Sequence, residues 1–129
     1  MENKTVVAVV NDLFFSVKIN EAARRAGVAL QYVTTGKDLL EKARAQPAMI
    51  IFDLNFDAAQ PLKLVQALKS DPALAGIDVL GYLSHVQEDL KAKALAAGCG
   101  TVMPRSAFSA NLGQIFTQRI SKTPNATPS

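Results

Sequence analysis

The chain contains little cysteine and no long hydrophobic run. Cys99 is the only cysteine among 129 residues. An internal disulfide and a cysteine-rich metal site are therefore excluded, and a reducing compartment suits this usage. The apolar run nearest the N-terminus, Val6–Val10, is too short for a signal-peptide core or a membrane span. We therefore predict a cytoplasmic protein that does not enter a membrane.

Dense clusters of positive charge are also absent. The net charge is +3 and the sequence pI about 9.2, values that are compatible with nucleic-acid binding. The lysines and arginines are nevertheless scattered along the chain, without interleaved aromatic residues. Such a distribution is typical of solvated helix faces. We therefore predict no nucleic-acid partner.

The sequence does contain enough apolar residues for one core. Hydrophobic residues make up 49% of the chain, which suits one domain of this length better than two. Residues 123–129 combine two prolines with small polar residues, a composition typical of disorder. We predict one domain over residues 1–122 and a disordered tail over residues 123–129.

Apolar runs alternate with helical patterns throughout this domain. The predicted strands are residues 6–10, 29–34, 48–52, 79–84 and 101–103. The predicted helices are residues 16–26, 37–45, 61 to about 70, 87–97 and 107–120, with a loop over residues 55–60. Strands that alternate with helices imply βα crossovers. We therefore predict an α/β fold with a parallel sheet between two helical layers.

Polar residues follow the apolar strands at their predicted carboxyl ends. Open parallel sheets bind ligands beyond this edge. The residues found there are Asn11-Asp12, Asp53, Ser84-His85 and Arg105. Because sealing carboxylates inside the protein would be costly, we expect an open site that faces a cation or a phosphoryl group.

Two carboxylates, a hydroxyl and a fixed cation suit phosphoryl transfer onto a carboxylate. Asp12 and Asp53 could hold a divalent ion, for which Mg²⁺ is the best match. Asp53 could attack phosphorus, with Ser84 donating to a phosphoryl oxygen and Arg105 pairing with the same group. The alternative is a structural role, in which Asp53 is a loop acid or cap and Asp12 caps the following helix.

Over Thr5 to about Ile120 the chain resembles the receiver domain of bacterial response regulators. The matching segments are Val10-Asn11-Asp12, Ile50–Leu54, Leu83-Ser84-His85 and Ala97–Met103. The resemblance implies a flavodoxin-like, doubly wound, three-layer (βα)5 fold with five parallel strands. It also implies a CheY-like signalling domain rather than an enzyme, with phosphate accepted from a histidine kinase or phosphotransfer protein and with Mg²⁺ required.

The resemblance also assigns roles by position. Asp53 matches the phosphoacceptor, Asp12 a direct metal ligand, and the Asn55 carbonyl a third ligand. Ser84 matches the switch hydroxyl, and Arg105 stands at the basic position of the last strand.

Several positions depart from the family pattern. Asn11 replaces a second acid, so Mg²⁺ is expected to bind more weakly. Arg105-Ser106 replaces a Lys-Pro pair, which exchanges a compact ammonium for a planar guanidinium. Val102 stands where a switching aromatic residue is common. The loop after Asp53 also lacks the usual proline and glycine.

Three functions are known for folds of this kind and suit these features to different degrees. The first is a stand-alone, atypical receiver that acts on a downstream protein in trans. The second is a pseudo-receiver, an interaction module independent of phosphorylation. The third, a flavin-binding electron carrier, is disfavoured because Asp12-Leu13-Phe14-Phe15 is acidic and bulky where a phosphate-cradling loop is needed.

Three further features were interpreted mainly as structural. His85 is expected to be a loop residue, with gating of the site as the alternative. Cys99 is expected to be a small, partly buried turn residue. An apolar patch of Val102, Met103 and Phe108 beside the last two helices could support a homodimer or partner docking.

Overall fold

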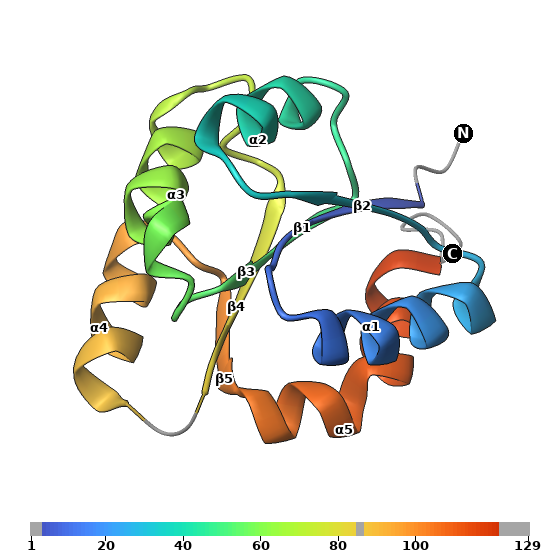
Figure 1. Cartoon of the computed structure of the whole chain (residues 1–129). Helices are drawn as coiled ribbons and strands as arrows, with labels where there is room; N and C mark the ends of the chain where they lie inside the picture. The colour runs from blue at the N-terminus through green and yellow to red at the C-terminus, as the bar shows by residue number, and fades with distance from the viewer. Residues whose placement is uncertain (1–3, 85–86, 122–129) are drawn as a thin grey trace.

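The computed structural model describes residues 4–84 and 87–121 and contains one parallel sheet (Figure 1). Its strands lie in the order β2-β1-β3-β4-β5, and every neighbouring pair is parallel. The strands are β1 (Thr5–Val9), β2 (Ala29–Val33), β3 (Met49–Asp53), β4 (Asp78–Leu83) and β5 (Thr101–Pro104). The predicted flavodoxin-like sheet of five parallel strands is confirmed.

Helices cover both faces of the sheet and complete three layers. Figure 1 shows α1 and α5 on one face and α2, α3 and α4 on the other. The helices are α1 (Leu13–Ala26), α2 (Gly36–Ala43), α3 (Pro61–Ser70), α4 (Glu88–Ala97) and α5 (Arg105–Ile115). A short 3-10 turn, η1 (Asp57–Ala59), lies within the predicted loop, and a π-helical segment, η2 (Phe116–Ser121), follows α5.

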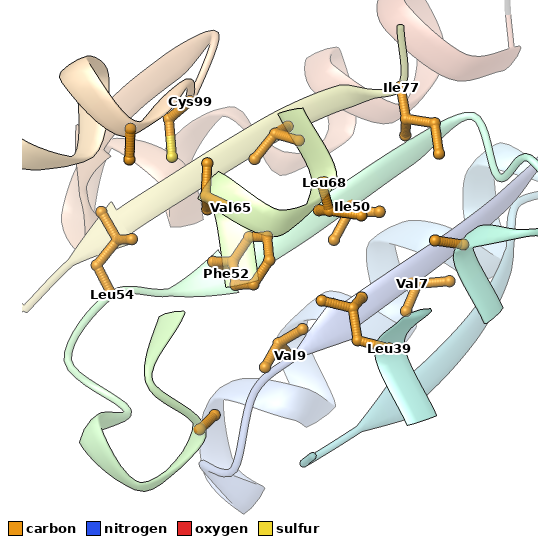
Figure 2. Close-up of a cluster of buried hydrophobic side chains, with 14 of the residues drawn as sticks. Val7, Val9, Leu39, Ile50, Phe52, Leu54, Val65, Leu68, Ile77 and Cys99 are labelled. Carbon is orange, nitrogen blue, oxygen red and sulfur yellow. The ribbon is translucent and has the colours of Figure 1, made fainter. Parts of the chain in front are cut away.

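Two apolar clusters hold the layers together, one on each face of the sheet. Because strand side chains alternate between faces, Ile50 and Phe52 of β3 join the cluster under α2, α3 and α4 (Figure 2). Met49 and Ile51 join the cluster under α1 and α5. The same alternation places the side chain of Asp53 on the α1/α5 face, at the carboxyl end of the strand.

The ends of two helices differ from the predictions. Helix α1 begins at Leu13 and not at residue 16, because Asp12 accepts a hydrogen bond from the Phe15 amide at 3.0 Å and caps the helix there. Its predicted end is confirmed, with Gly27 in the left-handed conformation (φ 72°). Helix α5 begins at Arg105 and gives way to η2, where the Thr117 hydroxyl donates to the Gly113 carbonyl within the widened turn.

The predicted apolar patch beside the last helices is partly wrong. Phe108 is 0% exposed and lies within the α1/α5 core, so it cannot contribute to a docking surface. Val102 and Met103 are half-buried and pack against opposite clusters. The sequence pattern suggested a surface because three apolar residues lie close together around β5, but the strand and helix direct them to different places.

The remaining predictions concern Cys99, His85, the C-terminal tail and the membrane. Cys99 is buried, and burial raises the pKa of its thiol to about 11, in agreement with a structural role. His85 and the predicted tail over residues 123–129 lie outside the described residues, so their roles stay predictions. Among residues 4–84 and 87–121, no helix has the length and apolar character needed to cross a membrane.

Candidate functional site

The candidate site lies where the strand order reverses. The chain passes from β1 to β2 on one side, and β3 then pairs with the other side of β1. Connections that leave in opposite directions open a crevice at the carboxyl ends of the two central strands. Asp12 follows the end of β1 and Asp53 is the last residue of β3. Folding therefore brings the two predicted carboxylates to the same crevice.

Asp53 is half-buried, and its side chain is hydrogen-bonded to the loop that follows β3. Its Oδ1 accepts a hydrogen bond from the Asn55 amide at 2.9 Å. Burial raises the pKa of Asp53 from its ordinary value. The Asn55 hydrogen bond and the Arg105 charge act in the opposite direction, whereas Asp12 and Asp57 add to the increase. A partly desolvated carboxylate that keeps one oxygen free of hydrogen bonds within the described residues is suited to act as a nucleophile.

Arg105 bridges the two helices that cover this face. It is the first residue of α5, and its Nη1 donates to Asp12 Oδ2 at 3.0 Å. Its guanidinium also lies over the Phe15 ring, 5.5 Å from the centroid. A cation at a helix N-terminus is disfavoured by the helix dipole, so the helix itself gives no reason for an arginine here. The carboxylates of the crevice give that reason, because they attract a positive charge.

Ser84 lies just beyond β4 and contacts the loop that follows Asp53. Its amide and its hydroxyl both donate to Asn55 Oδ1, at 2.7 and 3.0 Å. Asn55 Nδ2 in turn donates to Gln87 Oε1 at 3.0 Å. The asparagine side chain therefore fastens the start of the β4–α4 connection to the loop after Asp53. The Ser84 hydroxyl is exposed at the rim of the crevice and is engaged by Asn55 rather than by Asp53.

The predicted site residues thus lie at one edge of the sheet, where two pairs of them are in contact. Asp12, Asp53, Asn55, Ser84 and Arg105 all lie at the carboxyl edge of the sheet. Arg105 pairs with Asp12, and Ser84 pairs with Asn55. A cavity of about 620 Å³ opens beside them between α1 and α5; its lining is Asp12, Phe14, Phe15, Lys18, Ser84, Arg105, Ser106, Ser109 and Ala110.

One residue of this edge was missed by sequence reasoning. Tyr82 pairs directly with Asp53 in the β3–β4 register and is 2% exposed. Within its own sequence segment it is one apolar residue of the predicted strand over residues 79–84. The signal available was its position two residues before Ser84, which places it on the same face of the sheet as Asp53 once β3 and β4 are paired in parallel.

The oxygen donors at this edge fit a divalent cation such as Mg²⁺, but Arg105 already pairs with one of them. Asp12, Asp53 and the Asn55 carbonyl supply the hard oxygen donors that Mg²⁺ prefers. Asp53 Oδ2 accepts no hydrogen bond within the described residues, whereas Asp12 Oδ2 is held by Arg105. The Asn55 carbonyl accepts from the Asp57 amide at 3.0 Å and retains a second lone pair. Asn11 is exposed and adds no charge.

Solved structures share this architecture although no family model and no curated protein sequence matches the chain. A response regulator from Hahella chejuensis superposes with a TM-score of 0.81 at 20% identity, over 98% of this chain and 100% of that one. The chain has the receiver-domain fold. A putative response regulator from Chloroflexus aurantiacus gives a TM-score of 0.80 at 15% identity, over 94% of this chain and 100% of that one.

A third receiver structure also shares the fold. It is the receiver domain of a sensor histidine kinase from Pseudomonas aeruginosa, described with a magnesium ion coordinated in its active site cleft. Its TM-score is 0.77 at 14% identity, over 93% of this chain and 99% of that one. In the receiver fold of the present chain, the carboxyl edge of the sheet holds Asp12, Asp53 and Arg105.

Proposed function

We propose that the chain is a single-domain receiver that accepts a phosphoryl group on Asp53 in a two-component phosphorelay. The observation that carries the proposal is the meeting of Asp53, Asp12 and Arg105 at the strand-order reversal of a receiver fold. Asp53 is partly desolvated and ends a buried strand, as a nucleophile held in a fixed position requires. The domain would signal by contact with other proteins and would not turn over a metabolite.

The proposed transfer forms one bond and breaks one. An Asp53 carboxylate oxygen forms the new P–O bond, while the P–N bond of a phosphohistidine breaks. The imidazole nitrogen keeps the electron pair and takes up a proton as it leaves. With acetyl phosphate as donor, a P–O bond breaks and acetate leaves. Arg105, which pairs with Asp12 in the unmodified chain, would turn towards the added negative charge.

Mg²⁺ is the proposed cofactor, held by Asp12, Asp53 and the Asn55 carbonyl. When bound, it would neutralise negative charge on the phosphoryl group. Asn11 and the Arg105–Asp12 ion pair both favour weak binding, since the first removes a carboxylate and the second occupies one. Arg105 therefore has two tasks: it balances Asp12 before the cation binds and faces the phosphoryl group afterwards.

The phosphodonor protein is proposed to approach over the first turns of α1. Three large apolar side chains are exposed there, namely Leu13 at 83%, Phe14 at 91% and Val17 at 65%. Phe14 also lines the cavity that contains Asp12, Ser84 and Arg105, so this apolar surface is continuous with the site. A histidine kinase or phosphotransfer protein that docks here would bring its histidine to the crevice.

Beryllofluoride with Mg²⁺ tests the proposal directly. This reagent stands in for a phosphoryl group on a carboxylate, and wild-type protein should show amide shifts around residues 12, 53 and 105. Acetyl phosphate should add one phosphoryl mass. Asp53→Ala should give neither response. If wild type is unresponsive at millimolar Mg²⁺, the proposal is wrong.

A pseudo-receiver is the second candidate, and a specific observation favours it. The two residues that would respond to phosphorylation already have partners, Arg105 with Asp12 and Ser84 with Asn55. In this alternative, a partner protein would bind the receiver domain whether or not Asp53 is phosphorylated. Partner affinity that is the same for wild type, Asp53→Asn and beryllofluoride-treated protein would support the pseudo-receiver over the phosphorelay.

A further inference from the structure

The buried hydroxyl of Tyr82 has no hydrogen-bond partner among the described residues. The side chain is 2% exposed, so water does not satisfy it from the surface. A buried donor without a partner loses its hydrogen bonds to water and destabilises the folded state. An apolar side chain of the same shape would avoid this cost, since phenylalanine differs from tyrosine only in the hydroxyl. The hydroxyl therefore has a cost that the packing of the core does not explain.

The position of Tyr82 relates it to Asp53. The two residues are register partners on β4 and β3, and both side chains leave the sheet towards α1 and α5. A tyrosine reaches farther from the backbone than an aspartate. A hydroxyl on the longer side chain can therefore reach past the carboxylate, towards a group attached to it. Asp53 is also the charge that most strongly raises the pKa of Tyr82, after burial.

The ring is fixed in this position by its neighbours. It stacks on Phe108 with centroids 4.9 Å apart and an interplanar angle of 11°. Phe15 closes the other side, tilted by 56° at 5.1 Å. Phe108 lies on α5, which begins at Arg105. Phe15 lies on α1, which Asp12 caps. A donor held by aromatic packing loses little entropy when it forms a hydrogen bond.

We propose that Tyr82 is a phosphoryl-recognition residue, whose hydroxyl donates a hydrogen bond to an oxygen of a phosphoryl group carried on Asp53. The inference rests on the proposed receiver function. The phenol stays protonated at any physiological pH, because burial and the nearby carboxylates raise its pKa well above the ordinary value. It supplies a neutral donor, whereas Arg105 supplies charge. The core thereby takes part in sensing the modification.

The test compares two tyrosine variants in beryllofluoride titrations with Mg²⁺. Tyr82→Phe should fold with equal or higher stability and bind beryllofluoride about tenfold more weakly. Tyr32→Phe is the matched control. The Tyr32 hydroxyl donates to Asn20 Oδ1 at 2.9 Å, within hydrogen-bonding distance also of the Ser16 carbonyl, so its loss should lower stability without changing beryllofluoride affinity.

A spectroscopic readout separates recognition from a purely structural role. The chain contains two tyrosines, so labelling tyrosine at ¹³Cζ gives two resonances, which Tyr82→Phe assigns. Beryllofluoride should shift the Tyr82 signal and leave that of Tyr32 in place. Equal affinities for wild type and Tyr82→Phe, or an unmoved Tyr82 signal in responsive wild type, would overturn the tyrosine role alone. An unresponsive wild type would overturn the receiver function and this inference with it.

Discussion

Arg105 Nη1 lies 3.0 Å from Asp12 Oδ2, and this ion pair joins the start of α5 to the cap of α1. Both side chains remain partly exposed, at 38% and 34% respectively. Such a pair contributes little to stability, about 0–1 kcal/mol. Its importance lies in what it occupies, since Asp12 is the carboxylate expected to bind the divalent cation.

Removal of the guanidinium should tighten cation binding. In Arg105→Ala the guanidinium no longer competes with Mg²⁺ for Asp12, and the crevice becomes more negative by one charge. We expect the Kd for Mg²⁺ to fall about three- to tenfold, or about 0.7–1.4 kcal/mol. Amide chemical shifts at residues 12 and 53 during a Mg²⁺ titration measure it.

Arg119→Ala is the control for this change of charge. Arg119 pairs with Asp78 at 2.7 Å, at the amino end of β4 and thus at the opposite edge of the sheet. The Arg119→Ala substitution removes the same charge from the protein and should leave the Mg²⁺ affinity nearly unchanged. Equal effects of the two variants would mean that net charge, and not competition for Asp12, controls the cation.

Asp53 should make the domain less stable at neutral pH. Burial raises its pKa in the folded protein, so the folded state holds the proton more tightly than the unfolded chain. Stability is therefore lost as the pH rises from the ordinary aspartate value of 3.8 through the folded value. Asp53→Asn should be more stable than wild type at pH 7, by at most about 1 kcal/mol because partial exposure screens the charge.

The gain should shrink as the pH is lowered towards 3.8, where wild-type Asp53 is protonated as well. Urea unfolding between pH 4 and pH 8 measures this dependence. An Asp53→Asn variant that is less stable than wild type across the whole range would contradict the prediction.

The sequence predicted the sheet well because its signals are local. Buried parallel strands are continuous apolar runs, and the polar residues that follow them fall at one edge whatever the details of packing. Helix α1 was placed three residues late because Leu13 and Phe14 are exposed and break the amphipathic pattern, whereas the cap at Asp12 decides where the helix begins.

The pairings within the site could not be predicted in the same way. Ser84 and Asn55 are 29 positions apart, and Arg105 and Asp12 are 93 apart. Their contacts depend on side-chain reach across strands, which no sequence period encodes. Tyr82 was missed for a related reason: its meaning comes from the β3–β4 register, and within its own strand it is one apolar residue among several.

The Asn55 side chain should hold the β4–α4 connection in place. Asn55→Ala removes the oxygen that accepts both hydrogen bonds from Ser84, and it also removes the contact with Gln87. We expect a loss of about 1–2 kcal/mol in unfolding free energy and faster hydrogen exchange at the Ser84 amide. Gln87→Ala, which removes one of these contacts, should leave the Ser84 amide protected. Unchanged exchange in Asn55→Ala would show that the backbone alone fixes this connection.

Gly81 should be required for the placement of the loop after Asp53. A Cβ at this position would lie 2.8 Å from Leu54 Cδ1, and Leu54 is buried directly after Asp53. Gly81→Ala should cost about 1–3 kcal/mol and weaken the beryllofluoride response. The cost should be smaller in a Leu54→Ala background, which a double-mutant cycle measures.

Gly113→Ala provides the opposite expectation with the same change of residue. No atom lies within 4 Å of a Cβ built at this position in α5, and alanine is the better helix former. The variant should be more stable than wild type by up to about 1 kcal/mol. If Gly81→Ala is equally harmless, close packing of Leu54 against β4 does not position the loop.

Asp12 serves two structures at once, because Oδ1 caps α1 and Oδ2 holds Arg105. Any event that pulls this carboxylate towards a ligand must alter the first turn of α1, where the exposed apolar side chains lie. Thermodynamic linkage makes the effect reciprocal. A protein that binds to this turn changes the affinity of the crevice for its ligand by the same factor by which the ligand changes the affinity for that protein. A single aspartate would thus let a docking partner and the bound ligand sense each other without any movement of the sheet.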